Sequence, residues 1–296
     1  MRNGPVVVGV DGSKPSLDAV AAAAREARLR GVGLRVVHAF LWPAMHVPLG
    51  PSPTGPPDGG LRNMAERLVA DAVEHARTAE PEVEVEGEIV TGEPLTVLER
   101  RSRDAALTVV GSRGLGGFTG LLLGSTAVHL SAHGRCPVMV VRGRPEPAGH
   151  VLLGMDGSPA GEAAVEFAFA EASLRGAGLV ALHTWNNWTG PAVGGPGEPL
   201  PLVYDMDMLR DEEERVMAEA LSGWQAKYPE VTVHRRLVQA RTRPALIEAS
   251  EDAQLLVVGA RGRGGFAGLL LGSVSQAVLH HAHCPVAVVR HREAEH

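Results

Sequence analysis

The chain has 296 residues, of which 45% are hydrophobic and 21% are charged, a composition that excludes a disordered protein. Its 28 basic and 34 acidic residues give a net charge of −6, which argues against a surface that neutralises a nucleic-acid backbone. Two cysteines cannot form a secreted disulfide framework, and no stretch approaches the ~18 apolar residues that span a bilayer. We therefore expect a soluble cytoplasmic protein of about two domains, with neither a nucleic-acid nor a membrane partner.

The sequence contains one unit twice. Residues 6–13 (VVVGVDGS) return as residues 151–158 (VLLGMDGS), so that Asp11 corresponds to Asp156 at an offset of 145 residues. A repeat this long indicates two whole domains and not a solenoid.

The offset rises to 148 residues further along the chain. Residues 111–125 (GSRGLGGFTGLLLGS) match residues 259–273 (GARGRGGFAGLLLGS) at 12 of 15 positions, and a CPV-containing segment follows in each copy. The second copy therefore contains a short insertion. We expect domain 1 over residues 1–143, a linker over 144–150 and domain 2 over 151–296.

Apolar runs alternate with amphipathic stretches along the first copy. The runs predict strands at 5–10, 34–40, 106–110 and 137–141, with a weaker, alternating strand at 83–90. A helical apolar face is formed by Val20, Ala24 and Ala27, and further helical patterns lie at 61–79, 94–104 and 123–133. This order predicts an α/β fold with a parallel sheet, helices on both faces and right-handed crossovers.

Two Pro/Gly-rich segments, 43–60 and 186–203, follow the second expected strand of each copy. They are too long for ordinary connections, and we interpret them as lids or surface excursions.

A glycine-rich loop joins the fourth expected strand to the next helix in each copy. Glycines let the backbone approach a ligand closely, and the N-terminus of the following helix favours an anion. The carboxyl end of a parallel strand is also where open α/β sheets bind ligands. The same glycines could instead serve tight turns. The pattern G-x2-G-x9-G-S comprises Gly111, Gly114, Gly124 and Ser125 in the first copy, and Gly259, Gly262, Gly272 and Ser273 in the second.

Asp11 and Asp156 directly follow the first strand of each copy and have two interpretations. Either carboxylate could form a turn or helix cap in the sequence D-G-S, or it could accept ribose hydroxyls or water on Mg²⁺. The paired His38 and His183 are interpreted as satisfied core or crevice residues rather than bases.

The histidines near Cys284 do not predict a metal site. Of His280, His281, His283 and Cys284, only His281 and Cys284 keep their residue types in the first copy, as His133 and Cys136. Such spacing on one helix end does not form a tetrahedral cage. We expect both cysteines to be buried and structural.

Taken together, the G-(V/M)-D-G-S start, the G-x2-G-x9-G-S loop and the closing C-P-V strand resemble the universal stress protein family in its tandem form. The resemblance implies two tandem Rossmann-like (adenine nucleotide alpha hydrolase-like) domains, each a five-stranded parallel sheet of order 3-2-1-4-5. It also implies one ATP per domain. A glycine often precedes the third helix in the family, and Gly92 fits this pattern, whereas the second copy has Ala240.

The resemblance assigns roles to particular residues. Loop glycines would line the triphosphate, the G-S pairs would hold phosphate oxygens, the aspartates would lie by ribose and metal, and the main chain of Ala39 and Thr184 would meet adenine. The implied ATP-binding set is Gly9, Asp11, Ala39, Gly111, Ser112, Arg113, Gly114, Leu115, Gly116, Gly117, Gly124, Ser125 and Thr126 in the first copy, and Gly154, Asp156, Thr184, Gly259, Ala260, Arg261, Gly262, Arg263, Gly264, Gly265, Gly272, Ser273, Val274 and Ser275 in the second.

Three functions remain open at this point. The first is a stress-response regulator that binds ATP, with Mg²⁺, and hydrolyses it little or not at all. The second is a slow ATPase or phosphotransferase on the same sites, although no lysine follows Gly124 or Gly272 as a Walker A loop requires. The third is a nucleotide-free protein that acts by dimerising.

The last expected strands of the two copies, 137–141 and 285–289, would leave bare sheet edges. We predict that they pair antiparallel across a pseudo-two-fold axis, mainly through Val138, Val140, Val286 and Val288. Two such chains are expected to form a homodimer and to act on an unidentified regulatory protein partner.

Overall fold

A computed structural model describes residues 4–40, 60–115, 123–144, 148–185, 206–263 and 270–291. The Pro/Gly-rich segments 43–60 and 186–203 lie outside the described residues, except for Gly60. Within the described ranges, no helix is long and apolar enough to cross a membrane.

The first half of the chain alternates strands and helices as the apolar pattern predicts. Helix α1 illustrates the local causes: Ser13 caps its first turn by accepting a hydrogen bond from Ser16 N, and Gly31 ends it in the left-handed conformation. The elements are β1 (Val6–Gly9), α1 (Lys14–Arg30), β2 (Leu34–Phe40), α2 (Leu61–Ala79), β3 (Val85–Thr91), α3 (Pro94–Arg101), β4 (Leu107–Gly111), α4 (Ser125–His133) and β5 (Val138–Val141).

The second half repeats this order, with one difference at its first helix. A short 3₁₀ turn precedes α5, where α1 begins directly after its capping serine. The elements are β6 (His150–Met155), η1 (Pro159–Gly161), α5 (Glu162–Arg175), β7 (Leu179–Trp185), α6 (Met206–Lys227), β8 (Val233–Gln239), α7 (Thr242–Ala249), η3 (Ser250–Asp252), β9 (Ala253–Gly259), α8 (Ser273–His281) and β10 (Val286–Val289).

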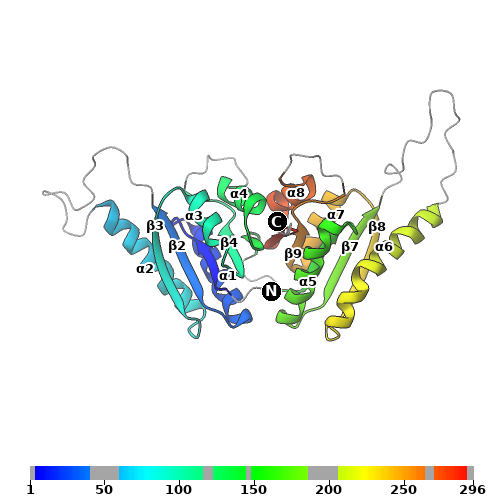
Figure 1. The fold of residues 1–296 in the computed structure, drawn as a ribbon, viewed down its shortest axis with the longest axis horizontal. Helices are drawn as coiled ribbons and strands as arrows, with labels where there is room; N and C mark the ends of the chain where they lie inside the picture. Colours follow the sequence, from blue (N-terminus) through cyan, green and yellow to red (C-terminus); the bar gives the residue numbers. More distant parts are fainter. Residues whose placement is uncertain are drawn as a thin grey trace, which may run out of the picture.

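All of these strands form one ten-stranded sheet of order β3-β2-β1-β4-β5-β10-β9-β6-β7-β8 (Figure 1). Each half has the order 3-2-1-4-5 with parallel neighbours, as the family resemblance implies. At the centre, β5 and β10 run antiparallel, with Val140 opposite Val286 and Val138 opposite Val288. The predicted pairing of the two closing strands is therefore confirmed, and the four valines are buried.

Helices cover both faces of the sheet, and each face has its own core. One core joins α1, α2, α5 and α6 to the sheet and includes Val20 and Phe169. The other joins α3, α4, α7 and α8 and includes Leu130 and Leu279. Because both cores contain residues from both halves, apolar packing continues across the central strand pair.

A buried ion network adds a second link between the halves on the α1–α5 side. Arg30 contacts Glu26 of its own helix and Glu171 of α5, and Arg175 contacts Glu171 and Glu26 in the same way. All four side chains are at most 7% exposed. The network has no net formal charge, since each arginine is matched by a glutamate.

Candidate functional site

The candidate site of the first half lies where β1 ends. Asp11 accepts hydrogen bonds at Oδ1 from Ser13 N (3.0 Å) and Ser13 Oγ (2.6 Å), which closes a tight turn before α1. The helix cap itself is Ser13. The interpretation of Asp11 as a turn residue is thus confirmed for one of its two carboxylate oxygens.

The other oxygen of Asp11 reaches the glycine-rich loop, 104 residues away along the chain. Leu115 N donates to Asp11 Oδ2 at 2.7 Å. A Cβ atom on Gly114 would lie only 2.3 Å from the same oxygen, so a side chain at this position would force the carboxylate and the loop apart. We call this contact between an aspartate and the loop the Asp–loop latch.

The second half forms the same latch at the end of β6. Asp156 Oδ1 accepts from Ser158 N at 2.9 Å, and Asp156 Oδ2 accepts from Arg263 N at 2.7 Å. A Cβ atom on Gly262 would lie 2.3 Å from Oδ2, as at Gly114. The repeat therefore preserves a three-dimensional arrangement as well as a sequence motif.

Hydrogen bonding keeps the Asp11 carboxylate charged. Partial burial raises the pKa of this group, but the hydrogen bonds from Ser13, Leu115 and Ser16 outweigh it and lower the pKa below its usual range. A carboxylate in this state can accept hydroxyl groups or coordinate a hard cation.

The glycine-rich loop returns to its strand just before the following helix begins. Gly124 N donates to Ser112 O at 2.8 Å, and Gly272 N donates to Ala260 O at 2.7 Å. Among the described residues, no side chain caps α4 or α8. Ser125 and Ser273, the first residues of these helices, are exposed. Each Asp–loop latch therefore lies beside an open helix N-terminus of the kind that favours an anion, and we call each latch with this helix start a crevice.

Other expected site residues have structural roles. A Cβ on Gly9 would approach Leu98 to 2.7 Å, and one on Gly154 would approach Leu246 to 2.9 Å, so these glycines admit the third helix of each half. A Cβ on Gly111 would lie 2.5 Å from Pro15 O, so this glycine admits the start of α1.

Several side chains of the expected set point to other protein groups. Thr184 Oγ1 lies 2.6 Å from Thr242 Oγ1, and Ser275 Oγ donates to Gly259 O at 2.7 Å. Ala39 is partly buried at the end of β2. Thr126 and Val274, in the first turns of α4 and α8, are also partly buried, whereas Arg113 and Arg261 are exposed. The remaining loop glycines lie outside the described residues: Gly116, Gly117, Gly264 and Gly265.

The second crevice contains a residue that the sequence did not indicate, Glu213 of α6. Glu213 Oε2 lies 2.7 Å from His183 Nε2, and His183 Nδ1 lies 2.9 Å from Met155 O. In the first crevice, His38 Nδ1 makes the corresponding 2.9 Å contact with Val10 O. Both histidines are hydrogen-bonded crevice residues, as expected. The sequence indicated that the histidine recurs in both halves, but it did not indicate Glu213 as the partner of His183.

Both cysteines are buried and free, in agreement with a structural role. Burial raises the pKa of the Cys284 thiol to about 12, so it stays protonated at neutral pH. Over the described ranges, no group of three or more His, Cys, Asp or Glu residues could hold a metal ion.

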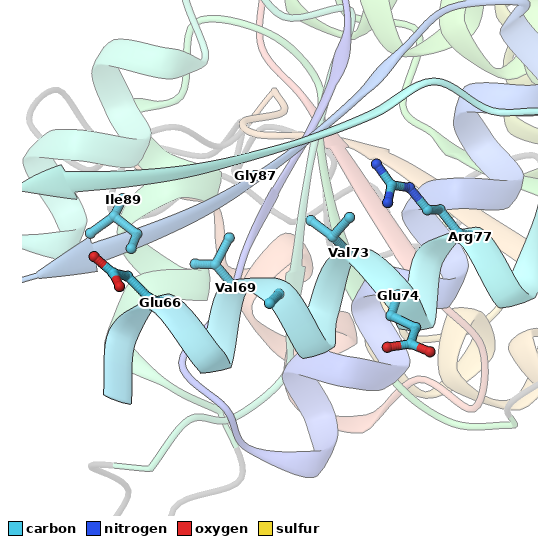
Figure 2. A pocket seen from close by; sticks show the side chains of 8 residues that line it. Glu66, Val69, Val73, Glu74, Arg77, Gly87 and Ile89 are labelled. Carbon is cyan, nitrogen blue, oxygen red and sulfur yellow. The ribbon is translucent and has the colours of Figure 1, made fainter. Parts of the chain in front are cut away.

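A separate groove of about 760 Å³ lies on the outer edge of the sheet, between α2 and β3 (Figure 2). Val69 and Val73 point from the helix towards the strand at Gly87, where a Cβ would lie 2.5 Å from Val69 Cγ1. Glu66 and Ile89 lie near one end and Arg77 near the other. This groove is distinct from the two crevices at the strand ends.

Fold and site define the chain as a pair of α/β units, each with an aspartate held against a glycine-rich loop at the carboxyl ends of parallel strands. The chain matches the universal stress protein family over residues 3–142 and 148–290, and it belongs to this family. It is 41% identical to a universal stress protein from Mycobacterium tuberculosis, over 96% of this chain and 94% of that one.

The fold agrees with that of a solved structure. A universal stress protein from Archaeoglobus fulgidus aligns with a TM-score of 0.68 and 20% identity, over 98% of this chain and 99% of that one. A universal stress protein solved in complex with cAMP matches 48% of this chain and 98% of its own, with 26% identity and a TM-score of 0.37.

Proposed function

We propose that the protein binds ATP with Mg²⁺ as a regulatory ligand in stress responses, with one site in each of the domains 1–143 and 151–296. The observation that supports this is the twofold occurrence of the Asp–loop latch beside an open helix N-terminus. Anionic phosphates suit the helix start, and a charged carboxylate suits ribose hydroxyls or a magnesium ion. This is a crevice for a phosphorylated ligand rather than an apolar one.

Particular residues would hold the nucleotide. Main-chain N–H groups and the hydroxyls at Ser125 and Ser273 would meet phosphate oxygens, and Asp11 and Asp156 would meet the ribose or the metal. Mg²⁺ would supply charge neutralisation between the phosphates and the carboxylate.

The described side chains favour binding over turnover. Phosphoryl transfer depends on cations positioned around the transferred group. The chain has only two lysines, and each lies against an acidic side chain: Lys14 pairs with Asp18, and Lys227 lies 3.5 Å from Glu166. We therefore propose little or no hydrolysis, far below the ~10 s⁻¹ of a median enzyme.

The test is to denature purified protein and identify released nucleotide, then to titrate nucleotide-free protein with ATP and Mg²⁺ by calorimetry. We expect ATP with some ADP, at up to two per chain. Protein that releases no nucleotide and does not bind added ATP would refute the proposal. Turnover near 10 s⁻¹ that is lost on loop mutation would establish the enzyme alternative instead. Sedimentation with and without ATP tests the proposed homodimer, and capture with ATP-loaded protein tests for a regulatory partner.

A further inference from the structure

The two crevices differ at a pair of positions that the repeat makes comparable. In the loop, Leu115 of the first half corresponds to Arg263 of the second, and each donates its main-chain N–H to the latch aspartate. On the helix above the crevice, Ala65 corresponds to Glu213 at the same offset of 148 residues. Two apolar residues thus stand where the second half has two opposite charges.

Packing supports the correspondence of the two helices. A Cβ on Gly12 would meet Leu68 of α2 at 3.0 Å, and a Cβ on Gly157 would meet Val216 of α6 at 2.2 Å. Because Leu68 and Val216 occupy the same place over the two turns, the residues one helical turn earlier, Ala65 and Glu213, do so as well.

In the second crevice, Glu213 connects three elements. Its Oε2 atom lies 2.7 Å from His183 Nε2 on β7 and 3.6 Å from Arg263 Nη1 in the loop. His183 Nδ1 lies 2.9 Å from the Met155 carbonyl oxygen, so the imidazole ring bridges the end of β6 and Glu213 of α6. Arg263 is anchored at its main chain by Asp156. Loop, helix and strand are therefore joined around the turn after β6.

The Arg263 guanidinium lies over that turn. Its Nη2 atom is 2.9 Å from the position of a Cβ on Gly157, in the D-G-S segment that contains the latch aspartate. Among the residues that the structure describes, the first crevice has no counterpart of this connection, since Ala65 is buried and uncharged and Leu115 is 73% exposed.

We propose that Glu213 makes the second crevice a charge-gated site, in which its carboxylate holds Arg263 against α6 and competes for it with the phosphates of an incoming nucleotide. This inference rests on the proposed function and concerns the regulation of one of its two sites. The second site therefore binds ATP more weakly than it would without Glu213.

The size of the effect follows from exposure. The Arg263 and Glu213 side chains are 45% and 23% exposed, so their attraction is partly screened. We expect Glu213→Gln to tighten ATP binding three- to tenfold in the second site and to leave the first unchanged. Glu214→Gln is the matched control, because Glu214 is on the same helix, half exposed and paired with Arg210 at 3.0 Å.

The experiment titrates ATP and Mg²⁺ against each variant and monitors the two loops separately by hydrogen exchange of the peptides around Leu115 and Arg263. A combined variant, Glu213→Gln with Arg263→Leu, should be no tighter at the second site than Arg263→Leu alone. Unchanged or weaker binding in Glu213→Gln, or an equal gain in Glu214→Gln, would overturn the inference.

Failure of the proposed function gives a different result. In nucleotide-free protein, the Arg263 amide should exchange more slowly than the Leu115 amide, and Glu213→Gln should remove this difference. If ATP protects neither loop although the difference is present, ATP binding fails and the competition with phosphate fails with it. If ATP protects both loops but the difference is absent, ATP binding stands and the role of Glu213 is refuted.

Discussion

The two crevices share a backbone arrangement and differ in the side chains that surround it. Asp11 and Asp156 each accept from one main-chain N–H of the turn and one of the loop, with donor–acceptor distances to the loop of 2.7 Å in both. Only Asp11 also accepts from the serine hydroxyl of its turn, that of Ser13. Around them, an alanine and an exposed leucine in the first half stand where the second half has the ion pair of Glu213 and Arg263.

This difference shows which part of a duplicated site is free to change. The latch requires a glycine and an aspartate together, because a Cβ at Gly114 or Gly262 would lie 2.3 Å from a carboxylate oxygen. The positions of Leu115 and Arg263 contribute only a main-chain N–H, so their side chains can vary without loss of the latch. Divergence at such positions can give two sites of one ancestry different ligand affinities.

The largest expected effect comes from separating the halves that are being compared. Val140 and Val288 are buried at the centre of the sheet, in β5 and β10. Replacing both with Asp would bury two unpaired carboxylates, and we expect a loss of several kcal/mol, with separation or unfolding of the halves. Thermal melting and solution scattering measure this. A double variant with the wild-type melting temperature and compactness would contradict the continuous sheet.

Variants of the buried ion network test whether the arginines of the two halves stabilise the contact between α1 and α5 equally. Arg175→Met would leave the buried carboxylates of Glu26 and Glu171 with Arg30 alone, and Arg30→Met would do the converse. Removing one partner of a buried ion pair costs about 3–5 kcal/mol, so both variants should lose a similar free energy of unfolding in urea. Lys14→Met, at an exposed pair, is the control and should change little. Strongly unequal losses of unfolding free energy would show that Arg30 and Arg175 do not contribute equally.

Much of this architecture could be predicted from the sequence because its signals are local or repeated. Val-rich runs indicate buried parallel strands, and two matching closing strands next to a short linker predict their antiparallel pairing. The Asp–loop latch was harder to predict from the sequence. The motifs named Asp11 and Gly114 as site residues, but only the fold brings a carboxylate oxygen to Leu115 N across 104 residues.

Glu213 could not be found from the sequence for a specific reason. Its counterpart Ala65 shares no chemistry with it, so the repeat gave no signal. The offset between the copies also changes from 145 to 148 residues between His183 and Glu213. The sequence alone therefore does not define which residue of α6 corresponds to which residue of α2, whereas the approach of Gly157 to Val216 in the structure does. The ion network was equally hidden, since Glu26 and Glu171 lie on helices whose contact depends on the central strand pair.

Substitutions in the turn before the third helix of each half are expected to have effects of intermediate size on stability. Gly92 has φ of +148°, and its N–H donates to Phe40 O at 3.0 Å, whereas no described residue other than glycine, Ala240 included, has a positive φ. Gly92→Ala should cost roughly 1–3 kcal/mol, because an L side chain is strained there and its Cβ would lie 3.0 Å from Val97. Ala240→Gly should cost only about 0.5–1 kcal/mol, through unfolded-state entropy. Urea unfolding of both variants measures this, and equal costs would mean that the two turns are equivalent.

The smallest expected effect is on the pH dependence of stability, and it distinguishes Cys284 from Cys136. Cys136 Sγ lies 3.2 Å from Thr108 Oγ1, but the residue corresponding to Thr108 in the second half is Leu256, so Cys284 lacks that hydroxyl. Burial raises the pKa of Cys284 from 9.0 to about 12, which means that the folded state favours the neutral thiol.

The sign of the resulting pH dependence follows from this shift. Above pH 9 the thiol ionises in the unfolded chain but not in the folded one, so its contribution to stability is complete below pH 9 and is lost as the pH rises towards 12. By pH 10 the loss is roughly 1 kcal/mol. Urea unfolding at pH 8 and pH 10 should therefore show a smaller alkaline loss in Cys284→Ala than in the wild type. Parallel pH dependence in the two proteins would show that Cys284 is not the group that responds, and Cys136→Ala provides the matched comparison in the first half.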